Sequence, residues 1–114
     1  MSERRADARM QIQVFVDHIL DEDAQCLCVS EDMSLDGMRV RRLPGQAWGE
    51  PRFVWLHFCL PGDFPLEIRA LGELCHDGSA DEDVRGFRFK YINPRDRRAY
   101  EDYLRSHSLS RIAS

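Results

Sequence analysis

Six short segments with the residue pattern of β-strands constrain the fold of this chain more than any other feature. They cover residues 12–20, 25–31, 38–43, 53–60, 66–76 and 84–92. β-Branched and aromatic residues are frequent in them, and glycine, proline or acidic residues mark the stretches between. Connections this short favour antiparallel pairing of successive strands. In a chain of 114 residues such a sheet closes most economically as a small barrel, so the sequence predicts an all-β fold, a six-stranded antiparallel β-barrel.

The alternation inside the segments predicts which side chains share a face of the sheet. The predicted sets are Ile12, Val14 and Val16; Cys26, Cys28 and Ser30; Ile68, Ala70 and Gly72; and Phe87, Phe89 and Tyr91. Residues 53–60 form the most apolar segment, which predicts a central strand. Residues 32–37, Asp-Met-Ser-Leu-Asp-Gly, are rich in turn formers and predict a loop.

A single helix is predicted after the last strand, as a lid on the barrel. Asn93 is a good N-cap, Pro94 suits the first helical position, and Asp96 lies near the positive end of the helix dipole. The side chains at helical spacing on one face are Tyr100, Tyr103, Leu104 and His107. The predicted organisation is a flexible, arginine-rich arm at residues 1–10, a barrel with its C-terminal helix at 11–107, and a tail at 108–114.

Composition and charge exclude several classes of function. The net charge of −4 argues against a general nucleic-acid binder, which needs a basic face. No apolar run reaches the roughly 20 residues of a membrane-spanning helix, and the charged N-terminus is followed by no apolar signal region. We therefore expect a cytoplasmic protein with no nucleic-acid partner, no membrane insertion and reduced cysteines.

No arrangement of residues predicts catalysis. Cys75 and His76 are neighbours, but adjacent residues on a strand point to opposite faces and cannot form a nucleophile–base pair. Cys26 and Cys28 share a face and could supply two ligands of a structural zinc if another cysteine or histidine converged on them. The acidic stretches lack the spacing of a calcium-binding loop. We expect no enzyme activity, no cofactor and no metal.

Two polar segments carry the chemistry of a ligand site. The first contains Arg4, Arg5 and Arg9. Their guanidinium groups suit bidentate contacts with phosphates and guanine edges. In the second segment, the Asp32 carboxylate can accept hydrogen bonds from ring N–H and amino groups, and the Ser34 hydroxyl can donate to a phosphate oxygen. Gly37 permits close backbone approach, so the two segments together match a ligand that has both phosphates and guanines.

The two patterns differ in specificity. The pattern RxxxR, at Arg5 and Arg9, carries no information alone, because about two such pairs are expected by chance at this composition. The pattern DxSxxG, at residues 32–37, has roughly 0.05 expected chance occurrences. The order of the two segments, with a gap of about 23 residues that accommodates one strand pair, strengthens the case for a site. A solvated arm followed by a β-turn is the purely structural alternative.

These residues resemble the signature of the PilZ domain family, in which RxxxR is followed by (D/N)xSxxG. The resemblance continues through the apolar segment at residues 53–60. It also includes residues 86–89, Gly-Phe-Arg-Phe, which are similar to the closing strand of the family. The resemblance implies a six-stranded antiparallel barrel with a C-terminal helix and a cyclic di-GMP site on its outer surface.

The resemblance also implies roles for the site residues. Arg5 and Arg9 would hold guanine edges and phosphates, and Asp32 would accept from the donor edge of the base. Ser34 and Gly37 would complete the loop. No signature position of this chain departs from the family pattern.

Two functions of different classes are consistent with the resemblance. The first is a receptor that binds cyclic di-GMP and signals to an unidentified effector protein. The second is a PilZ-fold interaction module, for example in type IV pilus or motility function, that does not depend on the nucleotide. The intact motifs favour the receptor. In the PilZ family an arginine directly before the first motif goes with two stacked ligands, so the resemblance implies, through Arg4, two cyclic di-GMP molecules per chain.

Overall fold

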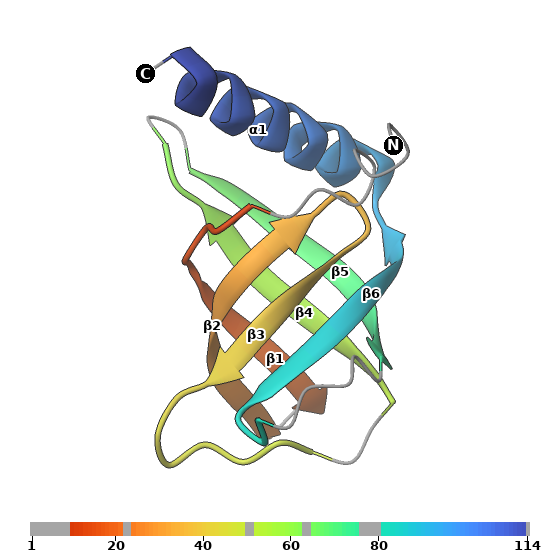
Figure 1. Ribbon diagram of the computed structural model, residues 1–114. Coiled ribbons are helices and arrows are strands. Elements are labelled where there is room, and N and C mark those ends of the chain that lie inside the picture. The colour runs from red at the N-terminus through yellow and green to blue at the C-terminus, as the bar shows by residue number, and fades with distance from the viewer. Residues whose placement is uncertain (1–9, 22–23, 50–51, 63–64, 76–80, 114) are drawn as a thin grey trace.

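Six strands form one closed antiparallel barrel in the computed structural model, which describes residues 10–21, 24–49, 52–62, 65–75 and 81–113 (Figure 1). The elements are β1 (Phe15–Asp21), β2 (Ala24–Ser34), β3 (Gly37–Arg42), β4 (Phe53–Leu60), β5 (Leu66–Cys75), β6 (Val84–Ile92) and α1 (Pro94–Ala113). Around the barrel the strands run β1-β2-β3-β6-β5-β4, and β4 pairs with β1 to close it. The predicted fold class is confirmed.

The predicted bounds of β4 and β6 are confirmed, whereas β1 begins later than predicted, at Phe15. The Ser30 side chain replaces part of the backbone ladder before that point. Its hydroxyl accepts from the Val14 N–H at 2.9 Å and donates to the Ile12 carbonyl at 2.5 Å. Residues 11–14 are therefore held against β2 without forming a strand, and the prediction of a strand from residue 12 is wrong.

Most of the side chains that the sequence alternation predicted to share a face point into the barrel interior. Those below about a tenth exposed include Ile12, Val16, Cys26, Cys28, Ser30, Ile68, Ala70 and Phe87. The prediction fails for Tyr91, which is 52% exposed. In the register, Leu71 pairs with Tyr91 and Gly72 pairs with Phe89, which leaves Lys90 as an extra residue on β6. This β-bulge reverses the alternation, so Tyr91 faces outward.

Helix α1 lies across one end of the barrel, as Figure 1 shows. The predicted N-cap is confirmed, because the Asn93 Oδ1 atom accepts from the Arg95 N–H at 2.9 Å. Tyr100 and Leu104 are buried, and the Tyr100 ring packs edge-on against Phe58 and Phe89. The helix continues to Ala113, so the predicted tail from residue 108 is corrected. Within the described part of the chain, no helix is long and apolar enough to cross a membrane.

The β3–β4 connection covers the opposite end of the barrel (Figure 1). Its Trp48 donates the indole N–H to the Glu82 carbonyl at 2.8 Å, and the Arg85 guanidinium lies 4.8 Å from the centroid of the same ring. Beneath it the His18 ring is almost fully buried, between Trp48 and Phe87. The barrel core therefore contains one imidazole among apolar side chains.

The cysteines occupy two kinds of environment. Cys26 and Cys28 are buried in the core with their Sγ atoms 3.8 Å apart, and burial raises the pKa of both thiols. Cys75 is half-buried, and Cys59 is exposed on the outside of β4. Among the described residues, no three histidine, cysteine or carboxylate side chains are grouped as a metal site.

Candidate functional site

The DxSxxG segment forms the closed end of the β2–β3 hairpin. Asp32 and Ser34 belong to β2, Gly37 begins β3, and only residues 35–36 form the turn. The loop predicted for residues 32–37 is therefore mostly strand, because the ladder continues up to the Ser34–Gly37 pair. The same register pairs Asp32 with Arg39. A guanidinium-bearing residue thus lies opposite the motif's carboxylate.

Asp32 lines a surface hollow of about 590 Å³. The other described residues that line it are Gln11, Gln13 and Glu31. The Glu31 side chain is held by Arg41, because its Oε2 atom accepts a hydrogen bond from the Arg41 Nε at 2.6 Å. Amide and carboxylate groups offer both donors and acceptors, so the hollow suits a polar ligand with mixed hydrogen-bonding edges.

A backbone bridge ties the start of the described chain to the motif strand. The Met10 N–H donates to the Met33 carbonyl at 2.8 Å, and the Met33 N–H donates to the Met10 carbonyl at 2.9 Å. Met33 lies between Asp32 and Ser34 in the motif, and Met10 directly follows Arg9 in the sequence. The bridge therefore fixes the residue next to the RxxxR pattern beside the DxSxxG pattern.

The three predicted arginines, Arg4, Arg5 and Arg9, lie outside the described residues. The same holds for the predicted flexibility of the arm, except at residue 10, which is held by the bridge to β2. Among the predicted site residues, the structure brings together Asp32, Ser34 and Gly37 in one hairpin.

Ser34 is buried within the hairpin, with 3% of its surface exposed. Its Oγ atom donates to the Gly37 carbonyl at 3.4 Å. Its own carbonyl accepts a hydrogen bond from the Tyr100 hydroxyl of α1 at 2.6 Å. In this structure Ser34 therefore connects the motif to the helix, and its hydroxyl does not face the solvent.

Gly37 lies where β3 pairs with β6, at a position that has no room for a side chain. It pairs with Arg88, and a Cβ atom built on it would overlap the Phe87 carbonyl oxygen. Any larger residue would force β3 away from β6. The close backbone approach predicted for this glycine is thus an approach to a neighbouring strand.

Four residues of the site were not predicted from the sequence. They are Gln11, Gln13, Glu31 and Arg39. The signal for Arg39 was present, because a two-residue turn at 35–36 makes it the partner of Asp32. The two glutamines become neighbours of the motif through the Met10–Met33 bridge and the Ser30 hydrogen bonds to Ile12 and Val14, and no local sequence pattern predicts these contacts.

Comparison with known proteins gives both family and fold. A model of the PilZ domain matches residues 3–106, a range that includes both motifs. No curated protein matches the chain. The structure of the Bacillus subtilis inhibitor of motility (MotI/DgrA) is similar over 90% of this chain and 50% of that one, with a TM-score of 0.68 and 18% identity. This chain therefore spans half the length of the Bacillus chain.

A second solved structure shows the same fold. It is the PilZ domain of CeSA from a cellulose-synthesizing bacterium, with a TM-score of 0.53 and 20% identity over 79% of this chain and 87% of that one. The range matched by the family model covers all six strands of the barrel and more than half of α1. This chain therefore belongs to the PilZ domain family, a family of cyclic di-GMP receptors whose domains are binding and regulatory modules.

Proposed function

We propose that this chain binds cyclic di-GMP beside Asp32 and relays the binding to an effector protein through helix α1. The Met10–Met33 bridge carries the proposal, because it anchors the end of the arginine arm next to the motif strand. An extended chain covers about 3.3–3.6 Å per residue. Arg9 and Arg5 are therefore within reach of a ligand that occupies the hollow.

The chemistry of the hollow supports a guanine ligand. The Asp32 carboxylate is an acceptor for the ring N–H and amino group of guanine, and the Gln11 and Gln13 amides can meet its oxygen and nitrogen acceptors. The described lining contains no cation, so the phosphates require guanidinium groups from the arm. Arg4 adds a third cation, and we propose that it supports a second, stacked ligand.

Two contacts support α1 as the relay element. The Tyr100 hydroxyl donates to the Ser34 carbonyl, and the Arg97 Nη2 atom lies 3.6 Å from the Asp36 Oδ1 in the turn. Both join the helix to the hairpin that carries Asp32. A ligand that shifts the hairpin changes these contacts, and the population of helix positions changes with them. The effector would read that change at the end of the barrel.

A nuclear magnetic resonance titration with cyclic di-GMP tests this relay. We expect amide shifts in residues 10–13 and 31–39, and a second set of shifts around residues 97–104 of α1. In a Tyr100→Phe variant the hairpin shifts should persist, while the helix shifts should fall because the bond to the Ser34 carbonyl is absent.

Tyr103→Phe is the matched control, since Tyr103 lies on the same helix and has no such bond to the hairpin. It should preserve both sets of shifts. Helix shifts of equal size in Tyr100→Phe and the native chain would contradict the relay. Absence of hairpin shifts in the native chain would contradict the binding site itself.

A further inference from the structure

An apolar row crosses the outer wall of the barrel on β4, β5 and β6. Trp55 pairs with Leu71, and Leu71 pairs with Tyr91, so the three side chains lie side by side across the strands. Trp55 is 39% exposed and Tyr91 is 52% exposed, and Phe53 on the same face of β4 is 48% exposed. Large aromatic side chains are thus concentrated on one wall and remain in contact with water.

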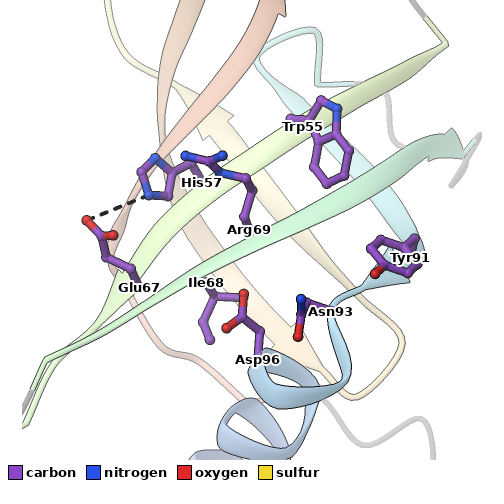
Figure 2. Close-up of a pocket in the computed structure, with 8 residues that line it drawn as sticks. All are labelled: Trp55, His57, Glu67, Ile68, Arg69, Tyr91, Asn93 and Asp96. Carbon is purple, nitrogen blue, oxygen red and sulfur yellow. Dashed lines mark ion pairs between the residues drawn. The ribbon is translucent and has the colours of Figure 1, made fainter.

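A depression of about 410 Å³ adjoins this row, and Figure 2 shows its lining. Arg69 lies in it, directly across the strand pair from His57. Arg69 makes no ion pair or hydrogen bond with any residue that the structure describes. Two neighbouring cations of the wall differ, because Arg52 and Lys90 both pair with Glu73, at 2.7 Å and 3.6 Å.

Two carboxylates, Glu67 and Asp96, also line the depression. Glu67 lies 3.9 Å from the His57 Nε2 atom, as the dashed line in Figure 2 marks, a contact that is an ion pair only when the imidazole is protonated. Asp96 is in the first turn of α1, where the helix dipole stabilises a carboxylate. Neither carboxylate forms an ion pair with Arg69, so this guanidinium can meet a carboxylate of another molecule.

An exposed arginine beside exposed tryptophan and tyrosine is the combination found at the energetic centres of protein interfaces. The aromatic rings supply apolar area, and they partly shield a charge pair formed beside them from water, which strengthens it. Sheet stability accounts for a cross-strand aromatic row, but it does not require an unpaired guanidinium next to the row.

We propose that this wall docks an extended segment of a partner protein that presents a carboxylate to Arg69 and an apolar or aromatic side chain to Trp55 and Tyr91. The Arg69 guanidinium, which has no partner among the described residues, is the group that argues for a carboxylate in the segment. β4 and β5 are separated from the β2–β3 hairpin by β1 and β6. Tyr91 of β6 lies beyond the part of β6 that pairs with β3, Val84–Arg88, so the segment and a ligand beside Asp32 would not compete. The proposal therefore does not rest on nucleotide binding.

Selection from a displayed library of random short peptides tests the wall. The native chain is the target, and the Arg69→Ala variant is used to remove peptides that bind elsewhere. We expect enriched peptides to carry aspartate or glutamate close to an aromatic or aliphatic residue. For synthetic copies, fluorescence anisotropy should show at least about tenfold weaker binding to Arg69→Ala and to Trp55→Ala. Binding to Arg105→Ala, a matched loss of one exposed arginine on α1, should be unchanged.

Replacing the acidic residue of each peptide by its amide should weaken binding to the native chain and leave binding to Arg69→Ala unchanged. Enriched peptides without an acidic residue, equal affinity for Arg69→Ala, or no enrichment would overturn the proposal. So would sedimentation that shows a dimer of the native chain dissociated by Arg69→Ala, because the wall would then be an interface between two copies. Arg69 is exposed, so the Arg69→Ala variant should keep its fold.

Discussion

Replacing Arg9 by alanine is expected to weaken the binding of cyclic di-GMP by about 10- to 100-fold, or about 1–3 kcal/mol, because a charge-assisted bidentate contact is lost. Arg5→Ala should have an effect of the same size. The two arginines would be the main cations for the phosphates, since the described lining of the hollow contains none. Calorimetric titration of each variant measures the change.

The melting temperature without ligand separates this role from a structural one. It should be nearly unchanged in Arg9→Ala, because the proposed contact is made with the ligand. Arg105→Ala is the control for loss of one positive charge, and its affinity for cyclic di-GMP should equal that of the native chain. Two results for Arg9→Ala would contradict a ligand-binding role of the arm. One is a large fall in the melting temperature without ligand, and the other is an unchanged affinity for cyclic di-GMP.

The native chain is expected to lose stability as the pH falls from about 6.5 toward 4, because of one buried histidine. Burial in the core, assisted by the nearby Arg85 guanidinium, lowers the pKa of His18 from 6.5 to about 4. Neither ring nitrogen has a hydrogen-bond partner among the described residues. In this window the unfolded chain takes up a proton that the folded chain refuses, so protonation favours unfolding.

The expected loss in unfolding free energy is roughly 1.4 kcal/mol per pH unit below about 6.5, and roughly 3 kcal/mol when the pH reaches the folded pKa. Above the pKa of His18 in the unfolded chain, protonation of this residue costs no unfolding free energy. Urea denaturation between about pH 7 and pH 5 measures how the unfolding free energy changes with pH. This window lies above the pH range in which carboxylates titrate. His18→Leu should remove most of the slope, and His57→Gln on the outer wall should retain it. A His18→Leu slope equal to the native one would contradict this origin.

The fold was predictable wherever local pattern and long-range pairing agree. β4 and β6 have the predicted bounds, because their apolar alternation ends at proline, glycine or acidic residues. The Asn93-Pro94 pair likewise predicted the start of α1. Prediction failed where a single residue alters a ladder. The Lys90 bulge turned Tyr91 outward, and the Ser30 hydroxyl replaced backbone pairing before β1.

The candidate site was predictable only in its motif residues. Asp32 lines the hollow, but composition did not show that turn-forming residues such as Ser34 continue a strand. Nor did it show that the Ser34 carbonyl meets Tyr100, a contact between residues 66 positions apart. Arg69 carried no signal, because its significance depends on which neighbours the β4–β5 register provides.

Binding of cyclic di-GMP to the native chain is best measured by calorimetric titration, with cyclic di-AMP as the matched control. We expect saturable binding of cyclic di-GMP with two ligands per chain. We also expect about 10- to 100-fold weaker binding of cyclic di-AMP, because adenine presents an amino group where guanine presents an oxygen. A sharp endpoint at one ligand per chain would contradict the proposed role of Arg4 but not the binding of cyclic di-GMP. No heat and no amide shifts with cyclic di-GMP, or equal affinity for the two nucleotides, would contradict the claim that this chain is a cyclic di-GMP receptor.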